Sequence, residues 1–148
     1  MKIYTSRYSN KDLATADAHI VGITLYPPRF PLKFKLEGNI GQLAPQKSYF
    51  KTADKALFRR RYLEQMEKLG EDGVQALVNP YTGDERDIIL LCYEDVTCDD
   101  PEKNWCHRQL LAEWLIDRLG WDVEDFPDRG NWKANHAEKP KFDQMQLF

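Results

Sequence analysis

The chain lacks any apolar run near the roughly 20 residues that a membrane-spanning helix requires. Residues 1–10 are mostly polar and contain no apolar segment of the kind found in a secretion signal. Cysteine is scarce, with three residues in 148, and this odd count without a secretion signal favours reduced thiols. These absences argue against a membrane or secreted protein, so we expect a cytoplasmic one.

Charge is unevenly divided along the chain, although the net charge is only −3. Residues 29–68 contain ten Lys or Arg and four Asp or Glu, whereas residues 71–128 contain four basic and sixteen acidic residues. A basic segment in an acidic protein is compatible with a surface that faces phosphates. It is equally compatible with a helix near Arg59 that keeps a solvated charged face, so both interpretations stay open.

Alternating strand-like and helix-like segments indicate a mostly parallel sheet with helices packed against it. The run from Ile88 to Tyr93 is the most continuously apolar strand, so we expect it at the centre of the sheet. After Pro127 the chain turns polar and loses periodicity, which predicts one domain over 1–126 and an extended tail over 127–148. The expected strands are 2–6, 18–25, 88–93 and a short one near 121–123, and the expected helices are a turn or two after Asn10, a short one near Ile40, 53–69 ended by Gly70, 72–78 and 105–119.

Candidate chemistry gathers at the end of the central strand and the start of the following helix. Glu94 follows the apolar strand, and Cys106, His107 and Arg108 open the helix. Ligands of open α/β sheets bind at the carboxyl ends of the strands, and a helix amino terminus attracts anions. We therefore expect a phosphate or other anion site, in which Arg108 holds the anion.

Three of these residues are candidate catalytic groups. Cys106 is a possible nucleophile, because a thiol at a helix amino terminus beside a cation has a lowered pKa. His107 is expected to exchange protons near neutral pH, and Glu94 to act as an acid or base if partly buried. The alternatives are a packed thiol, a locally hydrogen-bonded histidine, and a structural ion pair between Glu94 and Arg108.

The same segments resemble an uncharacterised prokaryotic and phage family, called domain of unknown function 488. The similarity rests on Leu90-Leu91-Cys92-Tyr93-Glu94, on Cys106-His107-Arg108, on 111–115 and on the opening segment 3–10, with Pro28-Arg29-Phe30 and Leu43-Ala44-Pro45 matching a common subgroup. The resemblance covers residues 1 to about 125. It implies an α/β domain of three layers, Rossmann-like or flavodoxin-like, and no settled activity.

One segment departs from the pattern of that family. Many members carry Asp-x-Arg at the end of the second strand, where this chain has Gly22-Ile23-Thr24 and neither charge. We expect Arg7 and Arg29 to supply the positive charge instead.

Metal, disulfide and phosphatase chemistry are weaker interpretations. Cys92, Cys98, Cys106 and His107 form no Cys-x2-Cys pair and fit a zinc site poorly, so no metal or cofactor is expected. A disulfide between Cys92 and Cys106 is a further alternative. Neither of these cysteines has the Arg six positions later that a phosphatase loop requires.

The carboxyl terminus ends in Gln144-Met145-Gln146-Leu147-Phe148, which resembles the peptide that binds the bacterial sliding clamp. In such a peptide Gln144 fixes orientation, and Met145, Leu147 and Phe148 make the apolar contacts. The alternative is a tail that folds its apolar residues back onto the domain.

Taken together, these features predict a protein associated with nucleotides or DNA, such as a repair or processing enzyme that the tail recruits to the clamp. The rival is an adaptor or inhibitor without catalytic activity, such as a phage-encoded one.

Overall fold

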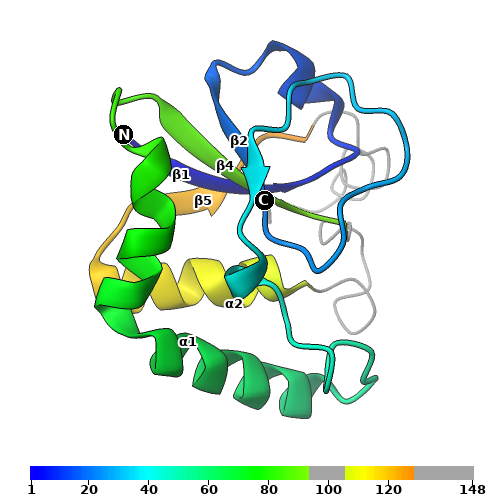
Figure 1. Cartoon of the computed structure of the whole chain (residues 1–148), viewed down its shortest axis with the longest axis vertical. Coiled ribbons are helices and arrows are strands. Elements are labelled where there is room, and N and C mark those ends of the chain that lie inside the picture. The colour runs from blue at the N-terminus through cyan, green and yellow to red at the C-terminus, as the bar shows by residue number, and fades with distance from the viewer. Residues whose placement is uncertain (94–105, 129–148) are drawn as a thin grey trace, which may run out of the picture.

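A five-stranded, entirely parallel sheet organises the computed structural model, which describes residues 1–93 and 106–128 (Figure 1). The order is β3-β2-β4-β1-β5, so the predicted central strand is confirmed: β4 has neighbours on both sides. Its residues from Ile88 to Cys92 are buried, which explains their uninterrupted apolar character. The strands are β1 (Ile3–Arg7), β2 (Ala18–Gly22), β3 (Gly38–Asn39), β4 (Asp87–Cys92) and β5 (Val123–Asp125).

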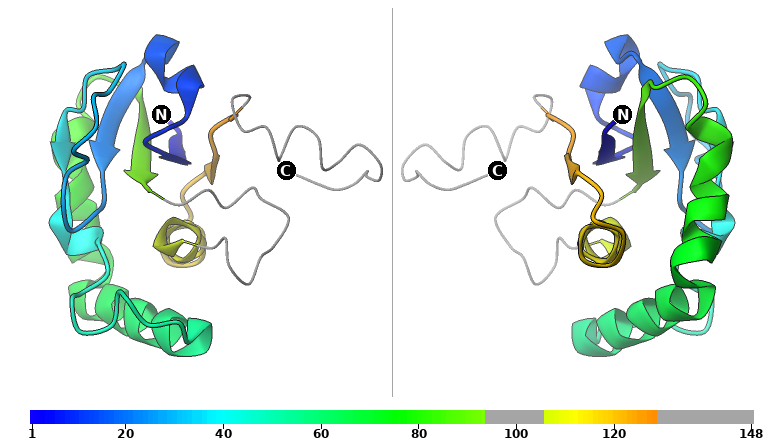
Figure 2. Two further views of the ribbon diagram at one scale, coloured as in Figure 1. Left: turned by 90° about the vertical axis from the view of Figure 1, so that its right-hand side faces the viewer. Right: turned by 90° about the vertical axis from the view of Figure 1, so that its left-hand side faces the viewer.

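Two longer helices and three short 3-10 helices connect the strands. Helix α1 (Lys55–Val78) bends at Gly70, whose φ of 72° lies outside the helical region (Figures 1 and 2). Helix α2 (His107–Trp114) continues as a π-helical segment (Leu115–Leu119) that ends at Gly120. The 3-10 helices are η1 (Lys11–Thr15), η2 (Gly41–Leu43) and η3 (Asn79–Tyr81).

The two faces of the sheet have separate cores, as expected for a three-layer α/β fold. Helices α1 and α2 cover one face, where Leu90 packs with Tyr62 and Leu111. The other face is covered by η1 and the 32–36 segment, which pack on Ile89 and Leu91. Alternate residues of β4 therefore enter different cores, and the predicted fold class is confirmed.

Individual hydrogen bonds account for the strand boundaries that differ from the predicted ones. Strand β2 ends at Gly22 rather than at residue 25, because Thr24 turns away to bond Asn39 and Tyr8. The last strand begins two residues later than expected, since the amide of Trp121 still donates to Leu115 at the end of the helix. No helix of the described residues is long and apolar enough to cross a membrane.

Candidate functional site

The parallel register brings the carboxyl ends of β1, β4 and β5 together. Arg7 pairs with Cys92 across β1 and β4, and Thr5 pairs with Asp125 across β1 and β5. Cys92 lies two residues after Leu90 in β4, so its side chain faces the side of the sheet that α2 covers. Arg7, its partner in the register, faces the same side. Helix α2 also starts at this edge, so the Cys106-His107-Arg108 triplet lies against the strand ends.

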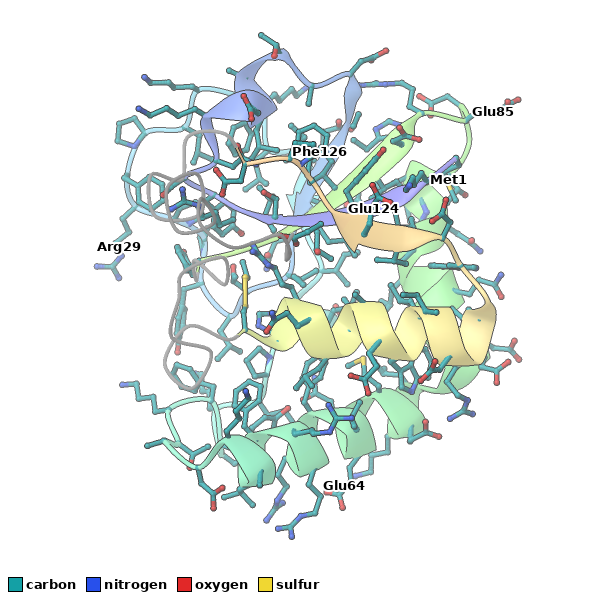
Figure 3. The ribbon with its side chains drawn as sticks, turned by 180° about the vertical axis from the view of Figure 1, so that it is seen from behind. Met1, Arg29, Glu64, Glu85, Glu124 and Phe126 are labelled. Atoms are coloured by element: carbon teal, nitrogen blue, oxygen red, sulfur yellow. A yellow bond between two sulfur atoms is a disulfide. The ribbon has the colours of Figure 1, made fainter. Side chains whose placement is uncertain are left out.

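Cys92 and Cys106 are joined at this edge. Cys92 is the last residue of β4 and Cys106 is the N-cap residue of α2, and the structure links their sulfur atoms in a disulfide that Figure 3 shows near the start of α2. This contact matches the disulfide alternative and arises because the strand register and the helix start place the two sulfurs together. The Cα atoms are 7.4 Å apart, beyond the distance that a disulfide bridges without backbone movement, so the same backbone is compatible with the expected reduced thiols.

His107 is buried between the sheet and α1. Its Nε2 atom donates a hydrogen bond to the carbonyl oxygen of Ile23, 2.6 Å away, and its Nδ1 atom lies 3.4 Å from Sγ of Cys106. Burial is the main cause that lowers the pKa of His107 to about 4, and the charge of Arg108 adds to the effect. The expectation that it titrates near neutral pH is therefore wrong, and at pH 7 its Nδ1 is a proton acceptor.

Arg108 is a buried cation, with only 1% of its side chain exposed. Its Nη2 atom lies 3.4 Å from Oδ2 of Asp125, and the other oxygen of that carboxylate accepts a 2.7 Å hydrogen bond from Thr5. Asp125 itself is 41% exposed, so this partner of the buried guanidinium reaches solvent.

The other two expected anion-binding residues lie at the same end of the molecule but differ in setting. Arg7 bonds Asp128 through its Nε atom at 2.7 Å. Arg29 is exposed and extends outward from the molecule, so it does not join Arg7 and Arg108 (Figure 3). Glu94 and the tail residues Gln144, Met145, Leu147 and Phe148 lie outside the described residues.

Sequence reasoning missed the two aspartates at this edge. Asp125 ends β5 and Asp128 follows it, and each contacts one of the predicted anion-binding arginines. Asp125 ends a strand that the sequence had already indicated, two residues earlier, and this placement at a strand terminus was the available signal. The aspartate partner of each arginine could not be predicted from the sequence, because it depends on which strand lies next to β1.

Metal binding finds no support in this part of the chain. Within residues 1–93 and 106–128 no group of three or more His, Cys, Asp or Glu side chains is arranged to hold a metal ion. Cys98, the remaining cysteine of the zinc alternative, lies outside these ranges.

Comparison with known proteins supports the family resemblance. The family model DUF488-N3a, described as the active DUF488-N3 subclade, matches residues 3–119 and so covers β1 to the end of the π-helical segment. No curated protein and no solved structure matches the chain.

Proposed function

This chain belongs to the DUF488 family, in the subclade DUF488-N3a, and on that premise we propose that the carboxyl edge of its sheet binds a phosphate-bearing ligand. The ligand class is a nucleotide or a nucleic acid. Arg108 and Arg7 are the anion-binding residues, and Cys106 and His107 are the groups nearest to them that can react.

The observation that carries the proposal is the burial of Arg108 at the start of α2. Removing a guanidinium from water costs several kcal/mol unless a close anion compensates it. Asp125 lies 3.4 Å away, is 41% exposed, and is one anion that compensates the charge. A buried charge of this kind at the ligand-binding edge of an α/β sheet is typical of a functional site.

Asp125 and Asp128 then act as internal competitors of the ligand. Each carboxylate engages one guanidinium in the ligand-free protein, and together they balance the two positive charges. A phosphate that approaches from solvent reaches Arg108 by displacing the exposed carboxylate of Asp125. Affinity for an anion is therefore expected to rise when Asp125 loses its charge.

Thiol chemistry is the catalytic part of the proposal. When the disulfide is reduced, Cys106 is a thiol at a helix N-cap whose sulfur lies 3.4 Å from an unprotonated ring nitrogen of His107. The thiol can donate a hydrogen bond to Nδ1, but a ring with a pKa of about 4 is a weak base. The thiolate that attacks an electrophile would therefore be stabilised by the helix amino terminus and by Arg108 rather than formed by proton transfer to His107. The description of the matching subclade as active is compatible with an enzyme and does not name a substrate.

Calorimetric titration of the reduced protein with nucleoside monophosphates tests the anion site. Arg108→Met keeps the apolar stem and removes the charge, and we expect it to weaken binding on the order of 10- to 100-fold, as for loss of a charged hydrogen bond. Asp125→Asn should tighten binding. The matched control is Arg86→Met, because Arg86 pairs with Asp17 and Asp84 at the opposite edge of the sheet.

Unchanged affinity in Arg108→Met, or absence of any binding by the wild type, contradicts the anion site. It would leave the rival function, an adaptor or inhibitor that binds a protein partner without catalysis. Weaker binding in Asp125→Asn would show that this carboxylate contacts the ligand or holds Arg108 in place rather than competing with it.

The finer part of the proposal is recruitment to a bacterial sliding clamp by Gln144, Met145, Leu147 and Phe148. It is supported by the sequence pattern of residues 144–148 alone, which lie outside the described residues. Deleting residues 144–148, or substituting both Leu147 and Phe148 by Ala, should abolish clamp binding and leave the unfolding free energy unchanged. A loss of stability in the deletion variant would instead support a tail that packs on the domain.

A further inference from the structure

Exposed aromatic side chains gather at the carboxyl edge of the sheet. The described part of the chain has five exposed large apolar side chains, and three of them are Tyr26, Phe30 and Tyr93, each at least 40% exposed. Solvent-exposed aromatic residues that cluster, rather than lie singly, mark binding surfaces. The remaining two, Met1 and Ile116, belong to other parts of the molecule.

Tyr93 joins the three residues into one surface. Its ring centroid lies 6.5 Å from that of Phe30 in an edge-on arrangement, and its hydroxyl donates a 2.8 Å hydrogen bond to the carbonyl oxygen of Tyr26. On its inner side the ring lies against Tyr8, 4.9 Å between centroids, and Tyr8 is buried. The surface is therefore fixed to the sheet from below, while its outer rings face solvent.

This aromatic surface adjoins the proposed anion site. Tyr8 follows Arg7 at the end of β1, and Tyr93 follows Cys92 at the end of β4. Consecutive residues of a strand point to opposite faces, so the rings and the arginines lie on the two sides of the same sheet edge, and a nucleic acid strand that contacts both must pass over that edge.

Positive charge borders the rings. The ammonium group of Lys47 lies 5.7 Å from the centroid of the Tyr26 ring. Arg29 precedes Phe30 and extends outward at this end of the molecule (Figure 3). Aromatic faces set among lysine and arginine side chains suit single-stranded nucleic acid, whose bases stack on rings while its phosphates contact cations.

We propose that Tyr26, Phe30 and Tyr93 form a stacking platform for the bases of single-stranded nucleic acid whose phosphate occupies the Arg7 and Arg108 site. This inference rests on the proposed function and names its substrate class. Base pairs of a duplex keep their faces stacked on one another, so the platform selects single strands over duplexes. The rival occupant, a partner protein, would need acidic residues to match the lysine and arginines.

Fluorescence anisotropy with labelled oligonucleotides tests the platform. The probes are a thymidine oligonucleotide of about 12 residues, an abasic strand of equal length and charge, the corresponding duplex, and thymidine monophosphate as a competitor. In the wild type the thymidine strand should bind on the order of tenfold tighter than the abasic strand, since stacking of each base contributes about that factor. Phe30→Leu and Tyr26→Leu keep apolar bulk but remove the rings, and they should bring this ratio towards one.

Three outcomes overturn the platform: no binding of the thymidine strand, equal affinity for the abasic strand in the wild type, or an unchanged ratio in both leucine variants. Ile116→Leu is the matched control, because Ile116 is an exposed apolar residue in the π-helical segment that follows α2. If thymidine monophosphate competes as well as the strand does, the ligand is a free nucleotide and the single-strand assignment is wrong. Tighter binding of the duplex would also contradict it.

The same assay distinguishes an error in the proposed anion site from an error in the proposed aromatic platform. Arg108→Met should weaken the thymidine and abasic strands by the same factor, because both carry the same phosphates. If that variant changes neither affinity while the leucine variants still remove the preference for bases, the proposed anion site is wrong and the aromatic platform stands.

Discussion

At the amino edge of the sheet His19 lies near solvent between two carboxylates, whereas at the carboxyl edge His107 is buried beside a carbonyl group and a sulfur. The ring nitrogens of His19 lie 2.8 Å from Glu37 and 2.8 Å from Asp84. Asp84 and then Glu37 raise the pKa of His19, whereas burial lowers the pKa of His107. The surroundings therefore favour the charged form of histidine at one edge and the neutral form at the other.

The arginines at the two edges also differ in their burial and in their charge partners. At the amino edge Arg86 is exposed and contacts Asp17, Asp84 and the carbonyl oxygen of Ala18, all of which hold β2 and β4 in register. At the carboxyl edge Arg108 is buried and one of its charge partners, Asp125, is 41% exposed. Figure 3 shows Glu85 at the first edge and Arg29 at the opposite one. Exposed charges that pair with one another are common in structural roles, whereas the buried charge is the reason for proposing a ligand site at the carboxyl edge.

The largest expected effect concerns the buried histidine. Because the folded pKa of His107 is about 4 and the unfolded value is about 6.5, the unfolded state binds more protons between these values. The stability from this group is full above about pH 6.5 and is lost as pH falls to about 4, a change of about 3 kcal/mol. Urea unfolding of the wild type and His107→Gln at about pH 7 and about pH 4 should show this loss in the wild type alone.

His19→Gln is the matched control for that measurement. Since His19 has a raised pKa, its removal leaves the acid-side loss from His107 in place. If the wild type and His107→Gln lose equal stability on acidification, His107 is accessible to solvent and the contrast between the edges fails.

Gly22 in β2 and Gly38 in β3 each lie close to a tyrosine side chain, so substituting each glycine by alanine measures how tightly that tyrosine is packed. A Cβ atom at Gly22 would collide with the hydroxyl of Tyr8, which is buried, and would lie 2.6 Å from Oδ1 of Asn39. A Cβ atom at Gly38 would collide only with the hydroxyl end of Tyr81, which is partly exposed.

We therefore expect Gly22→Ala to lower the unfolding free energy by about 1–3 kcal/mol, because Tyr8 and its 3.0 Å hydrogen bond to Thr24 must shift. Gly38→Ala should cost less than about 1 kcal/mol, since the Tyr81 ring can turn towards water. Denaturant titration of both variants gives the comparison, and equal costs would mean that Tyr8 yields to the added methyl group as readily as Tyr81 does.

The smallest expected effect concerns the exposed histidine. The pKa of His19 is raised, so its contribution is full below about pH 6.5 and is lost as pH rises above the folded pKa. His19→Gln should therefore lower the unfolding free energy by less than about 1 kcal/mol in mild acid and by nothing in base. A larger cost in base than in acid would show that His19 stabilises the amino edge as a neutral ring.

The sequence allowed most elements of the fold to be predicted, since each has a local cause. The apolar run that became β4, the helical spacing that ends at Gly70, and Asn10 as the cap of η1 all depend on neighbouring residues. The boundaries of β2 and β5 were missed because contacts with Asn39 and with the end of the π-helical segment decide them. Asn39 is brought beside Thr24 only by the pairing of β2 with β3, whereas the bond from Trp121 to Leu115 is local to the helix end.

Some features of the candidate site also follow from the sequence, and others follow only from the tertiary structure. Sequence alone determined that Cys106, His107 and Arg108 begin a helix after a buried strand, and it determined the family, because both are properties of consecutive residues. Only the tertiary structure decided that His107 is neutral, that Arg108 pairs with Asp125, and that Arg29 stands apart. Burial and charge partners follow from the β3-β2-β4-β1-β5 order and its register, which place residues more than a hundred positions apart within hydrogen-bonding distance.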